Sequence, residues 1–345
     1  MKWFICFFLS AACVFCFSQN MYPYHWDDDF QILSGKDIDW QKMEISPNWL
    51  FFNKYQNLFL KNKSLLFSSH QNTKIPKSMH FIWLGPKNFP ISSLPFIRSW
   101  ISLHPMWKII FWTDRERPAP CSGMEKRIID KFYLKDLKNC YEETTNWGEK
   151  SDLLRYEILK KEGGVYIDHD ASCLWPLDVL HQSFDFYAAL ADPHPQSLTV
   201  PNGCFGCVSN HPVLEKTIEI ILASHEKMKM LYPECVDEKR KVLSHTYIAL
   251  TRAVEEKIDL PGYQDIIFPT NYFWSQDIKK SVFLFHHYAG SWMKDKKTNL
   301  WENKIKKKFF KLKKMNRTLV VLEALLVLFM IIFFLLSLKE VRKTS

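Results

Sequence analysis

The sequence predicts a mixed α/β fold, in which one Rossmann-like nucleotide-binding domain precedes a C-terminal transmembrane helix. Residues 80–85 and Lys108 to Thr113 are expected to form buried strands, and apolar residues between them recur at helical spacing. Strand, helix and strand at this spacing make a βαβ unit. A separate run of twenty largely apolar residues, Leu319 to Leu338, reaches about 30 Å as a helix, the thickness of a hydrocarbon core.

The chain has 345 residues, enough for one large α/β domain or two small ones. We expect a signal peptide or apolar anchor at 1–18, an N-terminal extension at 19–74, the α/β domain at 75–300, a polybasic juxtamembrane segment at 301–317, the transmembrane helix at 318–338 and a short tail at 339–345.

The net charge of +9 is confined to the C-terminal end. From Lys304 onward there are eleven Lys or Arg and two Glu, so the rest of the chain is neutral. The basic run therefore suits the anionic headgroups of a membrane rather than a nucleic acid, and we expect no nucleic-acid partner.

The two ends of the chain disagree about membrane orientation. Trp3 to Phe17 resembles the apolar core of a signal peptide, although Ser10 to Cys13 loosely resembles a lipoprotein cleavage site. The basic charges before the C-terminal span favour a cytosolic body. Because the N-terminal run acts first during synthesis, we expect a single-pass protein whose body is exported or lumenal.

Nine cysteines do not resolve the compartment. Three lie in the N-terminal apolar run, and Cys204 and Cys207 form a C-x-x-C without a second such pair to complete a zinc site. We expect packing cysteines in the body, with a disulfide as the alternative.

The first predicted strand carries Trp83, which is expected at its C-terminal end. A helix through Phe96 and Trp100 follows, and then the second strand. No G-x-G-x-x-G motif is present in the sequence, which argues against a dinucleotide-dependent dehydrogenase.

A helix is predicted from Asn146, which with Glu149 resembles a capping box, to about Lys161. Asp152 and Arg155 lie three residues apart on it and therefore share a face. Such a pair is ordinarily a surface salt bridge.

Gly163-Gly164 ends this helix, and residues 165–167 read as a short buried strand. The strand delivers Asp168 and Asp170 to its C-terminal end, the edge where open α/β sheets bind ligands. Two carboxylates one residue apart can reach the same hard cation.

Later segments extend the domain. Residues 184–190 and 199–208 alternate like strands, and Asn202 is a weak candidate for a sugar contact. Asn210 and Pro212 start a helix that reaches about Met230. A final apolar strand, residues 282–285, precedes the segment H-H-Y-A-G-S-W.

The pattern S-D-x-x-R followed by G-G-x-Y-x-D-x-D, with H-x-x-W before it and H-x-x-x-x-S-W after it, resembles the DXD-containing glycosyltransferase family 32. This family includes fungal Golgi α-mannosyltransferases and inositol-phosphoceramide mannosyltransferases. The resemblance runs through scattered motifs over residues 75–292. It implies a GT-A fold and a retaining reaction that depends on Mn²⁺ or Mg²⁺.

The resemblance also implies a role for each motif residue. The catalytic residues would be Asp152, Arg155, Asp168 and Asp170; the nucleotide-sugar contacts would be Trp83, Asp152, Arg155, Tyr166, Asp168, Ser291 and Trp292; the metal ligands would be Asp168, Asp170 and His286. Trp83 would stack on the base, although core packing is the alternative.

We therefore expect a membrane-anchored glycosyltransferase that moves a hexose from a nucleotide sugar to a glycan or glycolipid. Mannose is the favoured hexose, and galactose and glucose are the alternatives. There are two alternatives. One is a metal-dependent phosphoryl transferase, which would require more carboxylates and a phosphate-binding loop. The other is a catalytically silent sugar-binding membrane protein.

Overall fold

The structure is a computed structural model that describes residues 47–67, 72–129, 133–191, 198–231 and 241–290. The chain divides into two compact units, Met1–Tyr288 and Ala289–Ser345. The predicted N-terminal apolar run, basic segment and transmembrane helix lie outside the described residues. Among the helices within the described ranges, none combines the length and apolarity needed to cross a membrane.

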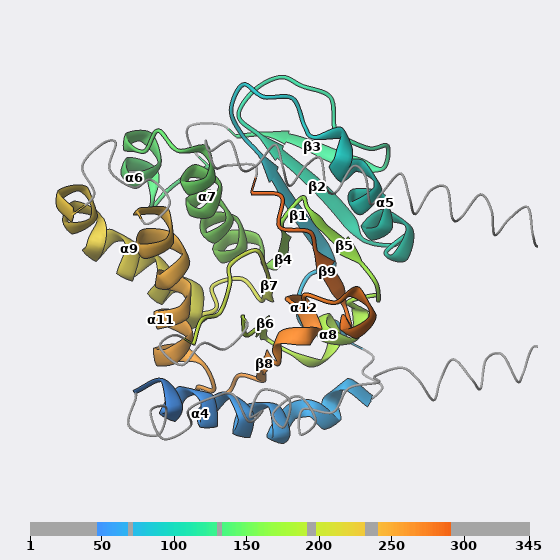
Figure 1. The fold of residues 1–345 in the computed structure, drawn as a ribbon, viewed down its shortest axis with the longest axis vertical. Coiled ribbons are helices and arrows are strands. Elements are labelled where there is room, and N and C mark those ends of the chain that lie inside the picture. Colours follow the sequence, from blue (N-terminus) through green and yellow to red (C-terminus); the bar gives the residue numbers. More distant parts are fainter. Residues whose placement is uncertain (1–46, 68–71, 130–132, 192–197, 232–240, 291–345) are drawn as a thin grey trace, which may run out of the picture. The chain divides into compact units, whose positions relative to one another are not determined.

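A seven-stranded sheet forms the centre of the first unit, with strand order β3-β2-β1-β4-β7-β6-β8 (Figure 1). A separate two-stranded sheet pairs β5 with β9. The strands are β1 Ser78–Trp83, β2 Lys108–Thr113, β3 Met124–Ile128, β4 Gly164–Ile167, β5 Ala171–Cys173, β6 Phe186–Ala189, β7 Cys204–Cys207, β8 Asp265–Phe268 and β9 Leu284–His286.

Parallel pairs predominate in the large sheet. β1 pairs in parallel with β2 and β4, β2 with β3, and β6 with β8, whereas β7 runs antiparallel to both β4 and β6. The carboxyl ends of β1, β2 and β4 therefore meet at one edge, and β7 starts from that same edge. This is the predicted mixed α/β class.

Helices cover the sheet. They are α4 Pro47–Asn62, α5 Leu94–Leu103, α6 Lys138–Glu143, α7 Trp147–Glu162, α8 Asp178–Ser183, α9 Pro212–Leu231, α11 Ile248–Lys257 and α12 Thr270–Phe273, with short turns η1 Lys63–Phe67, η2 Ile91–Ser93, η3 Leu243–Tyr247 and η4 Ile278–Lys280. Figure 1 shows α7, α9 and α11 together on one side of the sheet and α5 with the β5–β9 pair on the other.

Helix α7 begins where the sequence predicts. The side chain of Asn146 accepts hydrogen bonds from the backbone N–H groups of Gly148 and Glu149, at 2.8 and 3.1 Å, which satisfies donors that a helix start leaves open. The Glu149 carboxylate, however, accepts a hydrogen bond from Thr144 and faces His245. It therefore joins α7 to the segment before α11.

Two consecutive glycines connect α7 to β4, with φ of 66° at Gly163 and 95° at Gly164. A Cβ atom at Gly164 would lie 2.3 Å from Ser78 Oγ on β1. The pair is therefore required both for the left-handed backbone and for the close approach of β4 to β1. This geometry fixes where β4 begins, and Asp168 follows directly after the strand.

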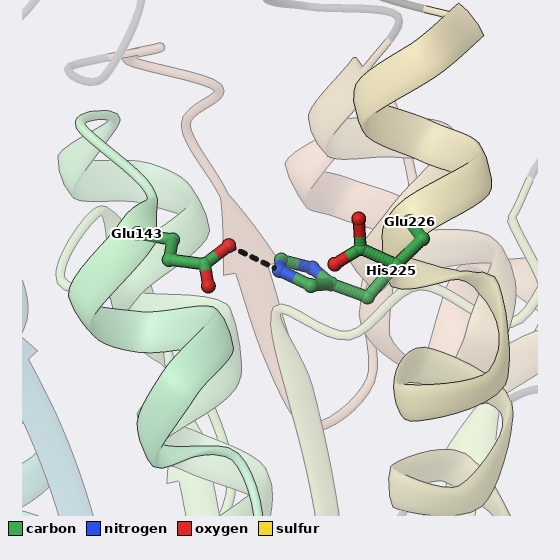
Figure 2. Close-up of side chains that lie close together, drawn as sticks. All are labelled: Glu143, His225 and Glu226. Atoms are coloured by element: carbon green, nitrogen blue, oxygen red, sulfur yellow. Dashed lines mark hydrogen bonds and ion pairs between the residues drawn. The ribbon is translucent and has the colours of Figure 1, made fainter.

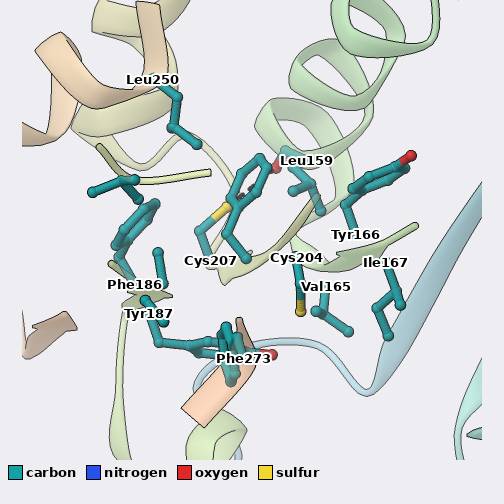
Figure 3. Packing of buried hydrophobic residues seen from close by; sticks show 14 of the residues in the cluster. Leu159, Val165, Tyr166, Ile167, Phe186, Tyr187, Cys204, Cys207, Leu250 and Phe273 are labelled. Carbon is teal, nitrogen blue, oxygen red and sulfur yellow. Dashed lines mark hydrogen bonds between the residues drawn. The ribbon is translucent and has the colours of Figure 1, made fainter. Parts of the chain in front are cut away.

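The core between the sheet and α7 is apolar and aromatic. Figure 3 shows Leu159 of α7 near strand residues that include Val165, Tyr166 and Phe186, with Leu250 of α11 packed over them. Burial of such side chains is the main force that holds the helices on the sheet. All four residues of β4 are buried, so both faces of this short strand are covered.

Three local predictions need correction. Residues 199–208 form a strand only over Cys204–Cys207, because the chain leaves the sheet before Gly203: Val200 N–H donates to Thr251 Oγ1 at 3.0 Å. The last strand, expected over residues 282–285, spans Leu284–His286 as β9 and pairs with β5. The N-terminal extension at 19–74, for which no helix was predicted, contains helix α4, whose Asn62 side chain donates to the carbonyl of Asp265 on β8 at 2.7 Å.

The packing interpretation of the cysteines is confirmed for the described residues. All five of their cysteines are free thiols, and Cys140, Cys173, Cys204 and Cys207 are buried. Burial raises the pKa of the Cys204 and Cys207 thiols. These thiols are therefore protonated packing groups.

Candidate active site

The end of β4 places Asp168 beside the start of β7. Asp168 N–H donates to the carbonyl of Gly203 at 2.8 Å. A Cβ atom at Gly203 would lie only 2.5 Å from Asp168 Oδ2, so this carboxylate occupies space that any larger residue would take. The antiparallel strand β7 is what brings residue 203 to this edge.

His286 reaches the same carboxylates from the far end of the unit. Ala171 of β5 pairs with His286 of β9, and this register places His286 Nε2 3.4 Å from Asp168 Oδ2 and 3.3 Å from Asp170 Oδ1. One ligand atom from each of the three side chains lies within 4.8 Å of the others. We call Asp168, Asp170 and His286 the DXD cluster.

Arg155 supplies positive charge next to the DXD cluster. Its Nη2 lies 2.7 Å from Asp152 Oδ1 and 3.7 Å from Asp168 Oδ1, and its guanidinium stacks over the Tyr166 ring at 3.9 Å. Burial would raise the pKa of Asp168, but Arg155 and His286 outweigh this effect and hold that pKa below its ordinary value. Asp168 is thus an ionised carboxylate.

Tyr166 orients Asp168 from β4. Its hydroxyl donates to Asp168 Oδ1 at 2.7 Å. Burial raises the pKa of Tyr166 well above its ordinary value, so the phenol keeps the proton that it donates. The hydroxyl therefore favours one rotamer of the carboxylate.

Asp152 and Arg155 belong to a closed set of buried hydrogen bonds, which we call the α7 ring. Arg155 Nη1 donates to the carbonyl of Asn202 at 2.6 Å, and Asn202 Nδ2 donates to Tyr156 Oη at 3.1 Å. Tyr156 in turn donates to the carbonyl of Thr246 at 2.9 Å, and Thr246 Oγ1 lies 2.5 Å from Asp152 Oδ2. Asn202 therefore holds the ring together instead of facing solvent.

The donor chemistry of the DXD cluster fits a divalent cation. Two carboxylates suit Mg²⁺ and Mn²⁺, and an imidazole is more readily accepted by Mn²⁺. In this structure His286 Nδ1 accepts the Tyr288 N–H at 3.1 Å, which places the ring proton on Nε2. Asp168 and Asp170 fit directly, whereas ligation by His286 Nε2 requires that this proton leave and the Tyr288 contact loosen.

Trp83 is placed at the end of β1 as predicted, but it is 9% exposed. Its Nε1 donates to the carbonyl of Lys87 at 2.8 Å, and its ring meets Phe89 and His169 edge to face. Since His169 is the middle residue of the D-x-D triplet, Trp83 supports that turn. Stacking on a nucleotide base stays a prediction.

The remaining predicted contacts come from the C-terminal segment that follows β9. Ser291 and Trp292 lie outside the described residues. His287, next to His286, stacks on Phe96 with ring centroids 3.8 Å apart and contacts Ser172 at 3.1 Å, so it packs against α5 and β5.

A second group of possible metal ligands lies on the helices, away from the strand ends. Figure 2 shows Glu143, His225 and Glu226, which we call the helix cluster. His225 Nε2 lies 2.9 Å from a Glu143 carboxylate oxygen. Lys229 contacts both Glu143 and Glu226, the latter at 2.8 Å. The lysine ammonium therefore already neutralises carboxylate charge that a metal would otherwise bind.

Residues 93–187 match the model of a family described as a glycosyltransferase sugar-binding region containing a DXD motif. The matched stretch runs from α5 to the first half of β6 and includes the helix of Asp152 and Arg155 and both carboxylates of the D-x-D triplet. This part of the chain is therefore similar to a DXD sugar-binding region. The resemblance found in the sequence is confirmed.

Two curated proteins are similar to parts of this chain. The chain is 28% identical over 173 residues to Subversion of eukaryotic traffic protein A of Legionella pneumophila, covering 45% of this chain and 26% of that protein. It is 29% identical over 175 residues to inositol phosphoceramide mannosyltransferase 3 of Schizosaccharomyces pombe, covering 50% and 45%. This chain thus spans less than half the length of either relative.

Among solved structures, the PaToxG glycosyltransferase is similar, at 19% identity with a TM-score of 0.41, covering 60% of this chain and 79% of that chain. The galactosyltransferase LgtC has a TM-score of 0.36 at 10% identity, covering 67% and 95%.

Sequence reasoning missed Gly203, Tyr156 and Thr246. Gly203 follows Asn202 within an expected strand, so nothing indicated that its lack of a side chain serves Asp168. Thr246 lies 94 residues from Asp152 in the chain, and no sequence pattern links them.

Proposed function

We propose that this chain is a glycosyltransferase that moves a hexose, with mannose favoured, from a nucleotide sugar to a glycan or glycolipid. The observation that carries the proposal is the convergence of the DXD cluster and the Asp152–Arg155 pair at the carboxyl ends of the strands. The family match and the mannosyltransferase relatives support it.

In the proposed reaction, Asp168 and Asp170 would hold Mn²⁺ or Mg²⁺, and His286 would be a third ligand. When bound, the cation neutralises charge on the diphosphate leaving group. Tyr166 keeps Asp168 in one orientation, and the deep burial of Arg155 makes its charge effective because the surroundings screen it poorly.

Asp152 and Arg155 are proposed to contact the donor sugar and the departing diphosphate, with Asp152 orienting the guanidinium. Trp83, Ser291 and Trp292 are proposed as further donor contacts. We propose a retaining reaction in which the acceptor attacks from the face of the departing diphosphate, whose own oxygen takes the acceptor proton. No protein group is therefore assigned as general base.

We also retain the proposal that the body is anchored by one C-terminal span at 318–338, with residues 301–317 against anionic headgroups. The basic composition of that segment supports it.

The test is a donor screen with the purified full chain. GDP-mannose, UDP-galactose and UDP-glucose are each incubated with Mn²⁺ or with EDTA, and release of the nucleoside diphosphate is measured. We expect turnover with one donor, GDP-mannose first, and none in EDTA. Donor binding without turnover, even when glycan and glycolipid acceptors are added, would instead support a silent sugar-binding protein.

A further inference from the structure

The segment before α11 contains a π-helical turn, η3 (Leu243–Tyr247). Ile248 N–H bonds to the carbonyl of Leu243, five residues back, in place of the usual four. Such turns are rare and occur frequently at functional sites. η3 is the segment that faces the polar side of α7.

Thr246 lies within this turn and is fully buried. Its hydroxyl lies 2.5 Å from Asp152 Oδ2 and 2.9 Å from the carbonyl of Val242, so it is fixed between the carboxylate and its own helix. Its carbonyl accepts the Tyr156 hydroxyl at 2.9 Å. One residue thus contacts α7 at two positions, four residues apart.

The remaining bonds of the α7 ring carry this constraint to the charged pair. Asp152 Oδ1 bonds Arg155 Nη2 at 2.7 Å, while Arg155 Nη1 is held by the carbonyl of Asn202 at 2.6 Å. Arg155 Nε, also buried, has no hydrogen-bond partner among the described residues. The close hydrogen bonds of the guanidinium therefore go to the Asp152 carboxylate and the Asn202 carbonyl, while the Tyr166 ring and Asp168 lie beside it.

We propose that Thr246 is a positioning residue for the transfer reaction: through its hydroxyl it fixes Asp152, and through Asp152 it aims Arg155 at the donor diphosphate. This inference rests on the proposed function. Loss of the hydroxyl leaves Asp152 Oδ2 buried without that donor, so the carboxylate is expected to turn and take Arg155 with it.

The chain offers a matched control in Thr217 of α9. Thr217 is also fully buried, and its hydroxyl donates to the carbonyl of Val213, four residues back, at 2.7 Å. Thr217→Val therefore removes the same kind of intrahelical hydrogen bond without touching the α7 ring.

The experiment compares Thr246→Val, Thr246→Ser and Thr217→Val in the full chain, with GDP-mannose and Mn²⁺ as the probe. We expect Thr246→Val to lower kcat by roughly 10- to 100-fold, the usual range for residues that orient a site's contacts, with KM within about twofold. Thr246→Ser keeps most of kcat because the hydroxyl remains. Thr217→Val keeps wild-type kcat.

If Thr246 has only a structural role, Thr246→Val and Thr217→Val should lower the melting temperature by similar amounts, and both variants should keep the wild-type kcat. This result would overturn the inference. If the wild type turns over none of the nucleotide sugars, the proposed function fails instead. Crystal structures of the two Thr246 variants then decide the positioning role: an Asp152–Arg155 pair unmoved in Thr246→Val contradicts it.

Discussion

The DXD cluster and the helix cluster have the same donors, two carboxylates and one imidazole, yet they differ as metal sites. In each, the three ligand atoms lie within 4.8 Å of one another. The DXD cluster is buried at two of its three residues, whereas both glutamates of the helix cluster are exposed. Donor composition alone therefore does not distinguish them.

The neighbours of each cluster make the difference. In the helix cluster, Lys229 and then His225 hold the pKa of Glu143 below its ordinary value, and Lys229 already neutralises the carboxylates. Around the DXD cluster, the nearest fixed cation within the described part of the chain is Arg155, which is 3.7 Å from Asp168 and binds Asp152 more closely. Negative charge there remains available to a metal.

Backbone support also differs. Asp168 N–H is bonded to the carbonyl of Gly203, and the Asp170 carbonyl accepts His287 N–H at 2.8 Å, so both ends of the D-x-D turn are fixed. The helix cluster consists of side chains on the surfaces of α6 and α9. The DXD cluster therefore differs from the helix cluster in its fixed backbone and in having one guanidinium shared between Asp152 and Asp168.

The largest expected effect is that of Asp170→Asn, which keeps the side-chain volume and removes the charge. We expect turnover of the nucleotide sugar to fall roughly 1000-fold, because metal stabilisation of the leaving group contributes several kcal/mol. Measured kcat with saturating Mn²⁺ checks this. An unchanged melting temperature in EDTA shows that the fold survives, and full activity would remove Asp170 from the site.

Trp83→Ala is expected to affect folding most. Removing a buried indole costs about 3–5 kcal/mol of unfolding free energy, and here it also removes the contact that supports His169. Urea denaturation measures the loss. If stability is kept and only nucleotide affinity falls, the base-stacking prediction for Trp83 is supported instead.

Gly203→Ala should weaken the DXD cluster without removing a ligand. Its Cβ would displace Asp168 Oδ2, or the Trp274 ring, which it would approach to 2.9 Å. We expect a decrease of about 10-fold or more in Mn²⁺ affinity, measured by calorimetry. Unaltered Mn²⁺ affinity would show that Asp168 is not held in the place described.

The smallest effect is expected for Glu143→Gln in the helix cluster. An exposed carboxylate paired with Lys229 contributes little, so the unfolding free energy should change by no more than about 1 kcal/mol. Transfer activity and Mn²⁺ affinity should stay at wild-type values. A marked loss of Mn²⁺ binding would reverse the comparison between the two clusters.

Local sequence signals predicted much of the fold around the site. The strands β1, β2 and β4, the start of α7 at Asn146 and its glycine stop follow from short-range patterns. Strands β3, β5 and β8 were not predicted; the exposed, charged residues of Met124–Ile128 give no apolar alternation.

The candidate site was predictable where motif residues are adjacent in sequence, as with Asp168 and Asp170. The contact with His286 came from the family resemblance and depends on the β5–β9 register. The role of Thr246 could not be predicted, because it depends on a π turn and on a partner 94 residues away.

The most direct test of the central claim is an anomalous difference map from crystals of the protein grown with Mn²⁺ and a nucleoside diphosphate. We predict a manganese peak between the carboxylates of Asp168 and Asp170, within reach of His286, and none at the helix cluster. A peak between Glu143, His225 and Glu226, or no peak at the DXD cluster, would contradict the account.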